Sequence, residues 1–176
     1  MPIVHHTHGR GTFERMAKGF SLIELMVVVA VAAVLAGVSY PVFTSIINAD
    51  RLSSQADELV SSLQFARSEA IRRNARVSVC GSADGATCGG AWNNVLTVVQ
   101  ADGTVLRVQN VKLPVQVSSS AARITYRADG LAATAVNTTI TACIPTTRPA
   151  ENQRRVSLAS VARVASVRFN GSGACP

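Results

Sequence analysis

The chain has 176 residues, 48% of them hydrophobic, and a formal net charge of +7. This length leaves room for about one small domain beyond an apolar N-terminal segment, which excludes a large multidomain enzyme. The basic balance suits a polyanionic partner, either nucleic acid or acidic lipid headgroups, although it is also compatible with a merely soluble surface.

The first predicted element is a short leader, residues 1–19. It carries Arg10, Arg15 and Lys18 against a single acid, Glu14, and a positive flank of this kind is typical of the cytoplasmic side of a membrane. His5, His6 and His8 also lie here. No histidine follows them, so the rest of the chain has no imidazole for catalysis or metal binding.

An apolar run follows, in which the only polar side chains from Phe20 to Val38 are Ser21 and Glu24. A carboxylate in hydrocarbon costs roughly 2.5–3.5 kcal/mol on insertion scales. No Lys or Arg lies between Gly19 and Arg51, so an α-amine exposed at Phe20 would be the nearest cation for Glu24. We therefore expect this carboxylate to have a partner and a role.

Two simpler interpretations of the run compete. An ordinary secretory signal peptide would have its core at residues 25–35 and a small-residue cleavage site at Val34-Leu35-Ala36. The other alternative is a plain transmembrane anchor. Neither alternative gives Glu24 a function.

The segment Lys18-Gly19-Phe20-Ser21-Leu22-Ile23-Glu24, with Pro41 and Phe43 after the run, resembles the prepilin motif of type IV pilins and of the pseudopilins of type II secretion. The resemblance implies that a membrane peptidase cuts after Gly19 and that the new terminus, Phe20, is N-methylated. It also implies that Glu24 pairs with the terminal amine of a neighbouring subunit. We expect a leader at 1–19, a transmembrane and filament-core helix at 20–43, and a globular head at 44–176.

The helix is predicted to continue to about Arg73, with a bend or local break at Pro41 because proline lacks an N–H and its ring clashes with the preceding turn. Beyond Pro41, apolar residues recur at three- and four-residue spacing and should face a partner surface. They are Leu52, Ala56, Leu59, Val60, Leu63, Ala66 and Ala70. Glu69 can pair with Arg72 and Arg73 at i+3 and i+4.

From residue 76 the pattern changes to short β-like runs. The predicted strands are 77–80, 95–100, 104–109, 111–117, 123–127, 138–144 and 161–169. Asp102-Gly103 predicts a hairpin turn, Asp129-Gly130 a second turn, and Pro114 an edge strand. Residues 145–153 look like a linker. The fold class is therefore α+β, a long N-terminal helix packed against an antiparallel sheet.

The four cysteines, Cys80, Cys88, Cys143 and Cys175, all lie beyond the apolar run. An exported domain would hold them in an oxidising compartment. Four cysteines allow three connectivities; we expect Cys80–Cys88 to close a short loop and Cys143–Cys175 to tie the C-terminal end to an earlier strand. A zinc site is the competing interpretation, but no Cys-x-x-Cys spacing supports it.

No group of residues in the sequence suggests catalysis. The acids beyond the apolar run form no paired motif for acid/base chemistry, and Cys80 has no base available to activate it. The sequence therefore predicts a protein that is not an enzyme and has no cofactor, no catalytic residues and no metal ligands. Trp92, beside the short cysteine loop, is predicted to lie in the core.

The head extends the resemblance. Residues 63–70 before Val77-Ser78-Val79-Cys80, Cys88 before Trp92, and residues 124–130 and 139–143 look like the minor pilins FimT and FimU and the pseudopilin GspH. The resemblance implies a minor, tip-associated type IV pilin that takes part in pilus assembly. The alternative is a GspH-type pseudopilin of the type II secretion system.

This resemblance also implies the partners and the location. The partners would be other major and minor pilins, the prepilin peptidase and the inner membrane. The protein would be a single-pass protein of the bacterial inner membrane before assembly, and part of a pilus or pseudopilus in the periplasm or at the cell surface afterwards.

Some FimT-like members bind DNA during natural transformation through C-terminal arginines in a Gly-Arg-x-Arg pattern, which falls here on residues 162–165; only Arg163 matches it. The C-terminal end is nevertheless basic, and guanidinium groups can contact duplex phosphates without reading sequence. The candidate DNA-binding residues are Arg148, Arg154, Arg155, Arg163 and Arg168. In a strand over 161–169, Arg163 and Arg168 would point to opposite faces.

Overall fold

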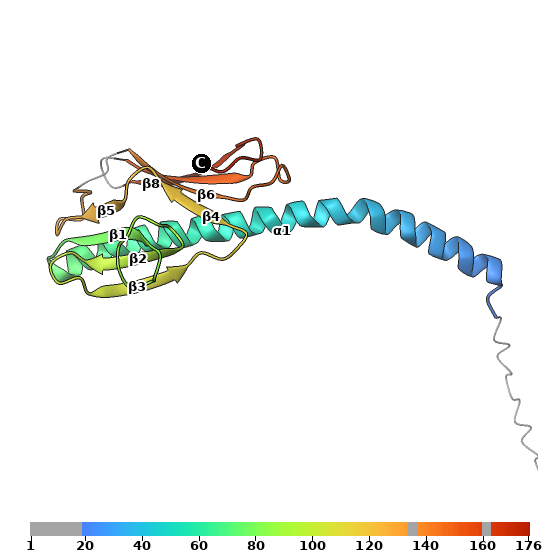
Figure 1. Ribbon diagram of the computed structural model, residues 1–176, viewed down its shortest axis with the longest axis horizontal. Coiled ribbons are helices and arrows are strands. Elements are labelled where there is room, and N and C mark those ends of the chain that lie inside the picture. The colour runs from blue at the N-terminus through green and yellow to red at the C-terminus, as the bar shows by residue number, and fades with distance from the viewer. Residues whose placement is uncertain (1–18, 134–136, 160–162) are drawn as a thin grey trace, which may run out of the picture. The chain divides into compact units, whose positions relative to one another are not determined.

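The computed structural model describes residues 19–133, 137–159 and 163–176. By its internal contacts the chain divides into two compact units, Met1–Tyr40 and Pro41–Pro176. Helix α1 (Leu22–Arg73), the only helix among the described residues, begins in the first unit and ends in the second (Figure 1). The predicted leader, apart from Gly19, lies outside the described residues.

The N-terminal part of α1 is apolar and exposed. Every described side chain from Leu22 to Gly37 is exposed, and this part of the helix is long and apolar enough to cross a membrane. A helix suits that environment because it satisfies its own backbone hydrogen bonds. α1 continues through Pro41 without interruption, so the predicted local break is wrong. The missing N–H removes one hydrogen bond, and the neighbouring turns keep theirs.

In the second unit, α1 provides one side of the hydrophobic core. The residues that the three- and four-residue spacing predicted to be inward-facing are buried, with Val60 partly so. Ala56, Ala66 and Ala70 are at most 1% exposed and belong to the core with the leucines of the same helix face. The predicted Glu69 pairs are present, with Arg72 Nη2 at 2.6 Å and Arg73 Nε at 2.7 Å from the carboxylate.

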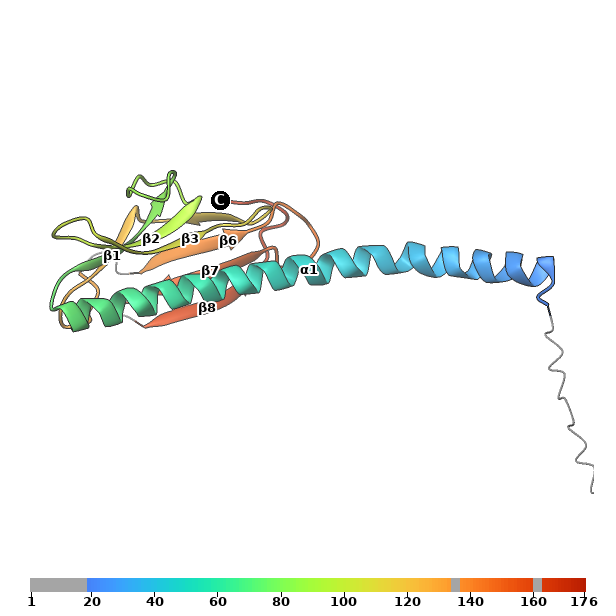
Figure 2. The same cartoon turned by 90° about the horizontal axis from the view of Figure 1, so that it is seen from below.

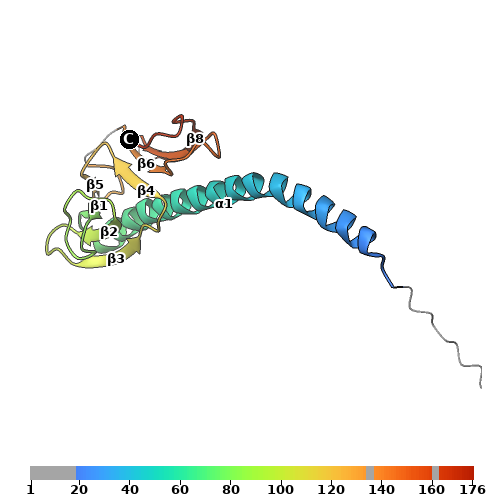
Figure 3. The same ribbon diagram turned by 45° about the vertical axis from the view of Figure 1, so that its right-hand side comes forward.

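Two antiparallel sheets cover this helix (Figures 2 and 3). The first contains, in spatial order, β3 (Val105–Asn110), β2 (Asn94–Val99), β1 (Val77–Ser82) and β5 (Arg123–Tyr126). The predicted hairpin joins β2 to β3, and Gly103 in its turn has φ +73°, a left-handed conformation that favours glycine.

The second sheet contains β4 (Gln116–Ser119), β6 (Thr138–Cys143), β7 (Gln153–Leu158) and β8 (Val164–Phe169) in that order. In register, Ile140 opposes Val156 and Thr138 opposes Leu158, and all four are at most 4% exposed. Both sheets and α1 contribute to one continuous hydrophobic core. Trp92, 7% exposed, belongs to it, as the sequence predicted.

The fold class is confirmed, and the differences concern individual strands. β7 begins inside the predicted linker and was missed, because its inward side chains include Arg154 beside Val156 and Leu158. The predicted strand 111–117 begins later, as β4, and is an edge strand as expected. β8 begins at Val164, and the start of the predicted strand, 161–162, lies outside the described residues.

Candidate functional site

The residues at the predicted processing position are accessible. Gly19 precedes the helix, and a Cβ added to it would meet no atom within 4 Å. Phe20 is 81% exposed. Both residues lie before the first helical residue, Leu22. The backbone at the Gly19–Phe20 bond is therefore not helical, and a peptidase could bind it in an extended conformation.

Ser21 is the N-cap of α1. The Glu24 N–H donates to the Ser21 carbonyl at 3.1 Å and to its Oγ at 3.3 Å, and the Leu25 N–H donates to the same carbonyl at 3.2 Å. A serine followed three residues later by glutamate is the capping-box sequence. The helix therefore starts two residues later than predicted, and Ser21-x-x-Glu24 was the sequence signal that could have located its start.

This cap places Glu24 in the first turn of α1 with its side chain exposed. A carboxylate at this end of a helix is stabilised by the helix dipole. Cleavage after Gly19 would create an α-amine at Phe20, immediately before the Ser21 cap. Gly19, Phe20 and Glu24 thus lie within one short segment, in which cleavage after Gly19 would bring a new amine close in sequence to an acid.

The five candidate DNA-binding arginines do not form one surface. Arg154 on β7 is only 5% exposed and donates through Nη1 to the carbonyls of Glu151 at 3.0 Å and Gln153 at 3.2 Å. Burial lowers the pKa of Arg154, the nearby Arg168 lowers it further, and Glu151 raises it. Arg154 is therefore a structural residue whose guanidinium supports the β6–β7 connection.

Arg155 points to the other face of β7. Its guanidinium carbon lies 3.2 Å from the centre of the Phe169 ring, and its Nε and Nη2 donate to Gln153 Oε1 at 3.3 and 3.2 Å. A guanidinium stacked on an aromatic ring and hydrogen-bonded to an amide is positioned by its neighbours. It is half-buried, which limits its availability to a ligand.

The other three arginines are exposed but separate. Arg148 lies in the β6–β7 connection, and Arg163 lies just before β8 in the connection at the opposite end of β7. The sequence predicted that Arg163 and Arg168 would point to opposite faces of one strand. That prediction does not apply, because Arg163 lies outside β8. Arg168 lies on β8, opposite Arg154, and its Nη1 is 3.9 Å from Glu151 Oε2.

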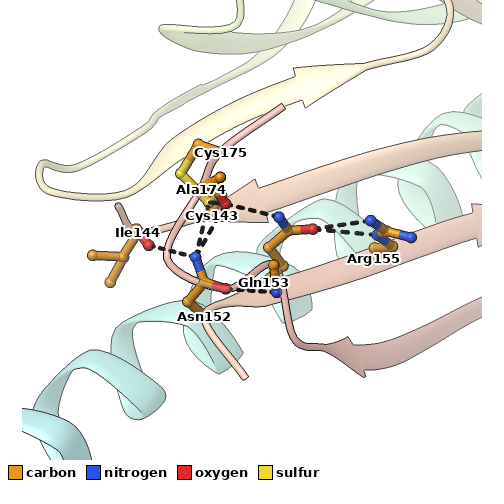
Figure 4. The surroundings of a disulfide bond; sticks show 8 residues. Cys143, Ile144, Asn152, Gln153, Arg155, Ala174 and Cys175 are labelled. Atoms are coloured by element: carbon orange, nitrogen blue, oxygen red, sulfur yellow. Dashed lines mark hydrogen bonds between the residues drawn. A yellow bond between two sulfur atoms is a disulfide. The ribbon is translucent and has the colours of Figure 1, made fainter. Parts of the chain in front are cut away.

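Both expected disulfides are present, Cys80–Cys88 and Cys143–Cys175, and no cysteine is free. The second lies in a hydrogen-bonded cluster (Figure 4). Asn152 Nδ2 donates to the Ala174 carbonyl at 3.1 Å and Gln153 Nε2 donates to it at 2.9 Å. The C-terminal segment is thus held to β6 and β7 by a covalent bond and by amide side chains that the sequence did not reveal.

The fold and the N-terminal segment define a membrane-anchored protein of the pilin class. The model of the family described as type II transport protein GspH matches residues 55–173, and the prokaryotic N-terminal methylation motif matches residues 15–40. The chain belongs to this GspH family, together with the related minor pilins. A comparison of the sequence with curated proteins gave no match.

Solved structures share the fold. Two crystal forms of the type IV minor pilin FimU of Pseudomonas aeruginosa are 23% and 22% identical to the chain, with TM-scores of 0.54 and 0.55. The matches cover 66% and 72% of this chain and 92% and 93% of FimU. The minor pseudopilin EpsH of the Vibrio cholerae type 2 secretion system is 14% identical, with a TM-score of 0.51, over 67% of this chain and 97% of EpsH.

Family membership and the methylation motif indicate where the protein acts. The apolar helix anchors the chain in the bacterial inner membrane, and the chain is then assembled into a pilus or pseudopilus. It assembles with other pilin subunits and is processed by a prepilin peptidase.

Proposed function

We propose that this chain is a minor type IV pilin, cleaved after Gly19, that enters the filament through Glu24 and takes a place at or near the tip. The observation that carries the proposal is the capped first turn of α1. It fixes an acid four residues after Phe20, in a segment without any Lys or Arg before Arg51.

The electrostatics favour a partner from another subunit. In the membrane, the free energy of the Glu24 carboxylate is raised by its apolar surroundings. A cation in the same surroundings would lower that free energy most effectively. Each mature subunit would bring one such cation, its Phe20 amine. Stacking subunits so that one amine meets the next carboxylate neutralises both charges and sets their register.

Glu24→Gln tests this proposal. The variant keeps the size of the side chain and removes its charge, and Glu24→Asp serves as the matched control that keeps the charge. We expect Glu24→Gln to be cleaved and anchored normally but lost from sheared filaments, whereas Glu24→Asp keeps measurable incorporation. Normal incorporation of Glu24→Gln would refute the pairing. Mass spectrometry of the mature terminus should show N-methyl-Phe20, and cleavage after Ala36 would contradict the division at residues 19 and 20.

In this proposal the chain has three parts: a removable leader at 1–19, a membrane and filament-core helix at 20–43, and a head at 44–176 that other subunits contact. The GspH-type pseudopilin is the alternative within the family. Deleting the gene separates the two: loss of surface pili with normal protein export supports the pilus role, and loss of export with normal pili supports the pseudopilus role.

Non-specific binding of duplex DNA is a second proposal, now limited to the exposed arginines. Arg148, Arg163 and Arg168 are accessible, and the nearest acid to any of them in the described salt bridges is Glu151, at 3.9 Å. Each phosphate contact adds about 0.9 to the slope of log affinity against log salt. Replacing all three with Gln should therefore lower the slope by about 2–3, measured by anisotropy with labelled duplex. An unchanged slope would refute this role.

A further inference from the structure

Two loops of the head meet α1 at the same place. In the β3–β4 connection, Lys112 and Leu113 line a cleft of about 300 Å³ together with Asp50 and Arg51 of α1. In the β6–β7 connection, the Arg148 carbonyl accepts a hydrogen bond of 3.2 Å from Asn48 Nδ2. Figures 1 and 2 show both connections at the same end of the two sheets. We call this end the head base: α1 residues 48–51 with the connections 111–115 and 144–152.

The head base presents an unusual apolar side chain. Leu113 is 87% exposed, more than Phe20 at 81%. A single exposed leucine is ordinary on a protein surface, but this one lines a cleft with Asp50 and Arg51 of α1, and the helix just before them is apolar and exposed. In the turns of α1 just before Asn48, Phe43, Ile46 and Ile47 are 63%, 60% and 48% exposed.

Three cations belong to the head base, and two of them, Arg51 and Lys112, line the same cleft as Leu113. Arg51, Lys112 and Arg148 are exposed, and none of them forms a salt bridge with a described carboxylate. The acids nearby are Asp50 and Glu58 in the same cleft and Glu151, which lies 3.9 Å from Arg168. Glu58 is two turns farther along α1 than Asp50, about 12 Å.

The length of the uncharged run in α1 sets how far Asn48 lies from Glu24 along the helix. Between Glu24 and Asn48 lie the 23 residues 25–47, which include no charged side chain. At 1.5 Å per residue they span about 35 Å, which fits a hydrocarbon layer of about 30 Å at an ordinary tilt. Asn48 to Arg51 would then emerge in the headgroup layer, where long basic side chains reach phosphates.

We propose that, before assembly, the head base rests on the outer face of an anionic phospholipid bilayer. Leu113 enters the boundary between headgroups and acyl chains, and Arg51, Lys112 and Arg148 contact lipid phosphates. This docking would hold the head in one orientation on the membrane while the subunit waits for extraction. It goes beyond the proposed function, because it depends on an inserted anchor and not on incorporation into a filament.

Depth-dependent quenching tests the docking with the full chain in vesicles of phosphatidylethanolamine and phosphatidylglycerol. Leu113→Trp places a reporter on the head base. Val105→Trp is the matched control, an exposed apolar residue at the opposite end of β3, about 17 Å from the strand end that leads to Leu113 at 3.3 Å per residue. Trp92 is retained, and its emission is subtracted with the unsubstituted chain. We expect lipids brominated near the headgroup to quench Leu113→Trp and not Val105→Trp. Absent quenching at 113, or equal quenching at both positions, would overturn the proposal.

The charge contribution has its own test. Replacing Arg51, Lys112 and Arg148 with Gln should weaken docking by about fivefold per cation, seen as reduced quenching of Leu113→Trp. The control replaces Arg67, Arg72 and Arg76, exposed arginines at the far end of α1 and just beyond it, and should leave the quenching unchanged. Two results together would overturn the pairing with anionic headgroups. The quenching of Leu113→Trp would be the same in both triple variants, and it would be the same in pure phosphatidylcholine vesicles as in the anionic vesicles.

Discussion

Arg154 and Arg168 lie directly opposite each other on β7 and β8, yet the first is 5% exposed and the side chain of the second is 69% exposed. The difference arises because Arg154 is on an inner strand facing α1, whereas β8 is the edge of its sheet. Two arginines that look alike in the sequence therefore have different roles, one structural and one available to a partner.

The pair gives the first prediction. Arg154→Gln should reduce the free energy of unfolding by about 1–3 kcal/mol, because it removes the donor from the Gln153 carbonyl in a buried position and from the partly buried Glu151 carbonyl. Arg168→Gln should change it by about 0.5 kcal/mol or less, as exposed substitutions usually do. Urea unfolding of the full chain in detergent, followed by Trp92 fluorescence, measures both. Equal losses for the two variants would contradict the assignment.

The second prediction concerns the acid stability of the end of α1. Hydrogen bonds from Arg72 and then Arg73 lower the pKa of Glu69 from 4.5 to about 2. Because the folded-state pKa is depressed, Glu69 stabilises the fold above pH 4.5, and this contribution is lost as the pH falls from 4.5 toward 2. Glu69→Gln should flatten the stability curve in that window.

The matched control for Glu69 is Asp50→Asn, which removes an exposed helical carboxylate that forms no salt bridge with a described residue. Asp84 contributes with the same sign, since hydrogen bonds from the Thr87 and Ala86 N–H groups and from the Ser82 and Thr87 hydroxyls lower its pKa. Asp84→Asn should therefore flatten the curve as well. An Asp50→Asn curve as flat as that of Glu69→Gln would show that the effect is a general charge effect.

The third prediction concerns the turn after β5. Gly130 has φ +77°, and an added Cβ would lie 2.8 Å from Ile71 Cδ1. Gly130→Ala should destabilise the fold by about 1–2 kcal/mol from the backbone alone, with crowding of Ile71 in addition. Gly89→Ala, where a Cβ would meet nothing within 4 Å, should be close to neutral. Thermal unfolding of both variants would show the contrast, and similar melting temperatures would contradict it.

The fourth prediction compares the two disulfides. In the loop-entropy model the bridge that closes the longer loop stabilises more, so Cys143–Cys175, with a separation of 32 residues, should contribute about 4 kcal/mol and Cys80–Cys88, with a separation of 8, about 2.5 kcal/mol. Replacing each pair by alanine and measuring denaturant unfolding provides the comparison. Non-reducing peptide mapping checks the connectivity, and a Cys88–Cys143 peptide would refute it.

The helix was the most predictable part of the fold. Residues such as Leu52, Leu59 and Leu63 recur at the helical period, and burial of one face follows from that period alone. The Gly103 hairpin was equally readable, since its turn requires a left-handed residue. These features depend on neighbours in sequence, and local chemistry determines them.

β7 and the arginines were less predictable because their environment is set by distant residues. Arg154 was predicted to be a DNA-binding residue just after a linker, but the strand order puts it between β6 and β8, on the side of α1. Arg155 is held by Phe169 from β8 and by Gln153. No spacing rule in a single sequence gives a contact between residues 14 positions apart, such as Arg155 and Phe169, and therefore none gives which basic residues share a surface.

The closing segment of the chain ties folding to export. Ala174 accepts from Asn152 and Gln153 beside the Cys143–Cys175 bridge, and that bridge forms only where thiols are oxidised. On the reducing side of the membrane the head would thus lack the disulfide that holds its C-terminal segment. A head with the Cys143–Cys175 bridge formed must therefore have crossed the membrane. An assembly machinery that accepts only disulfide-bonded heads would reject subunits whose head had not been translocated.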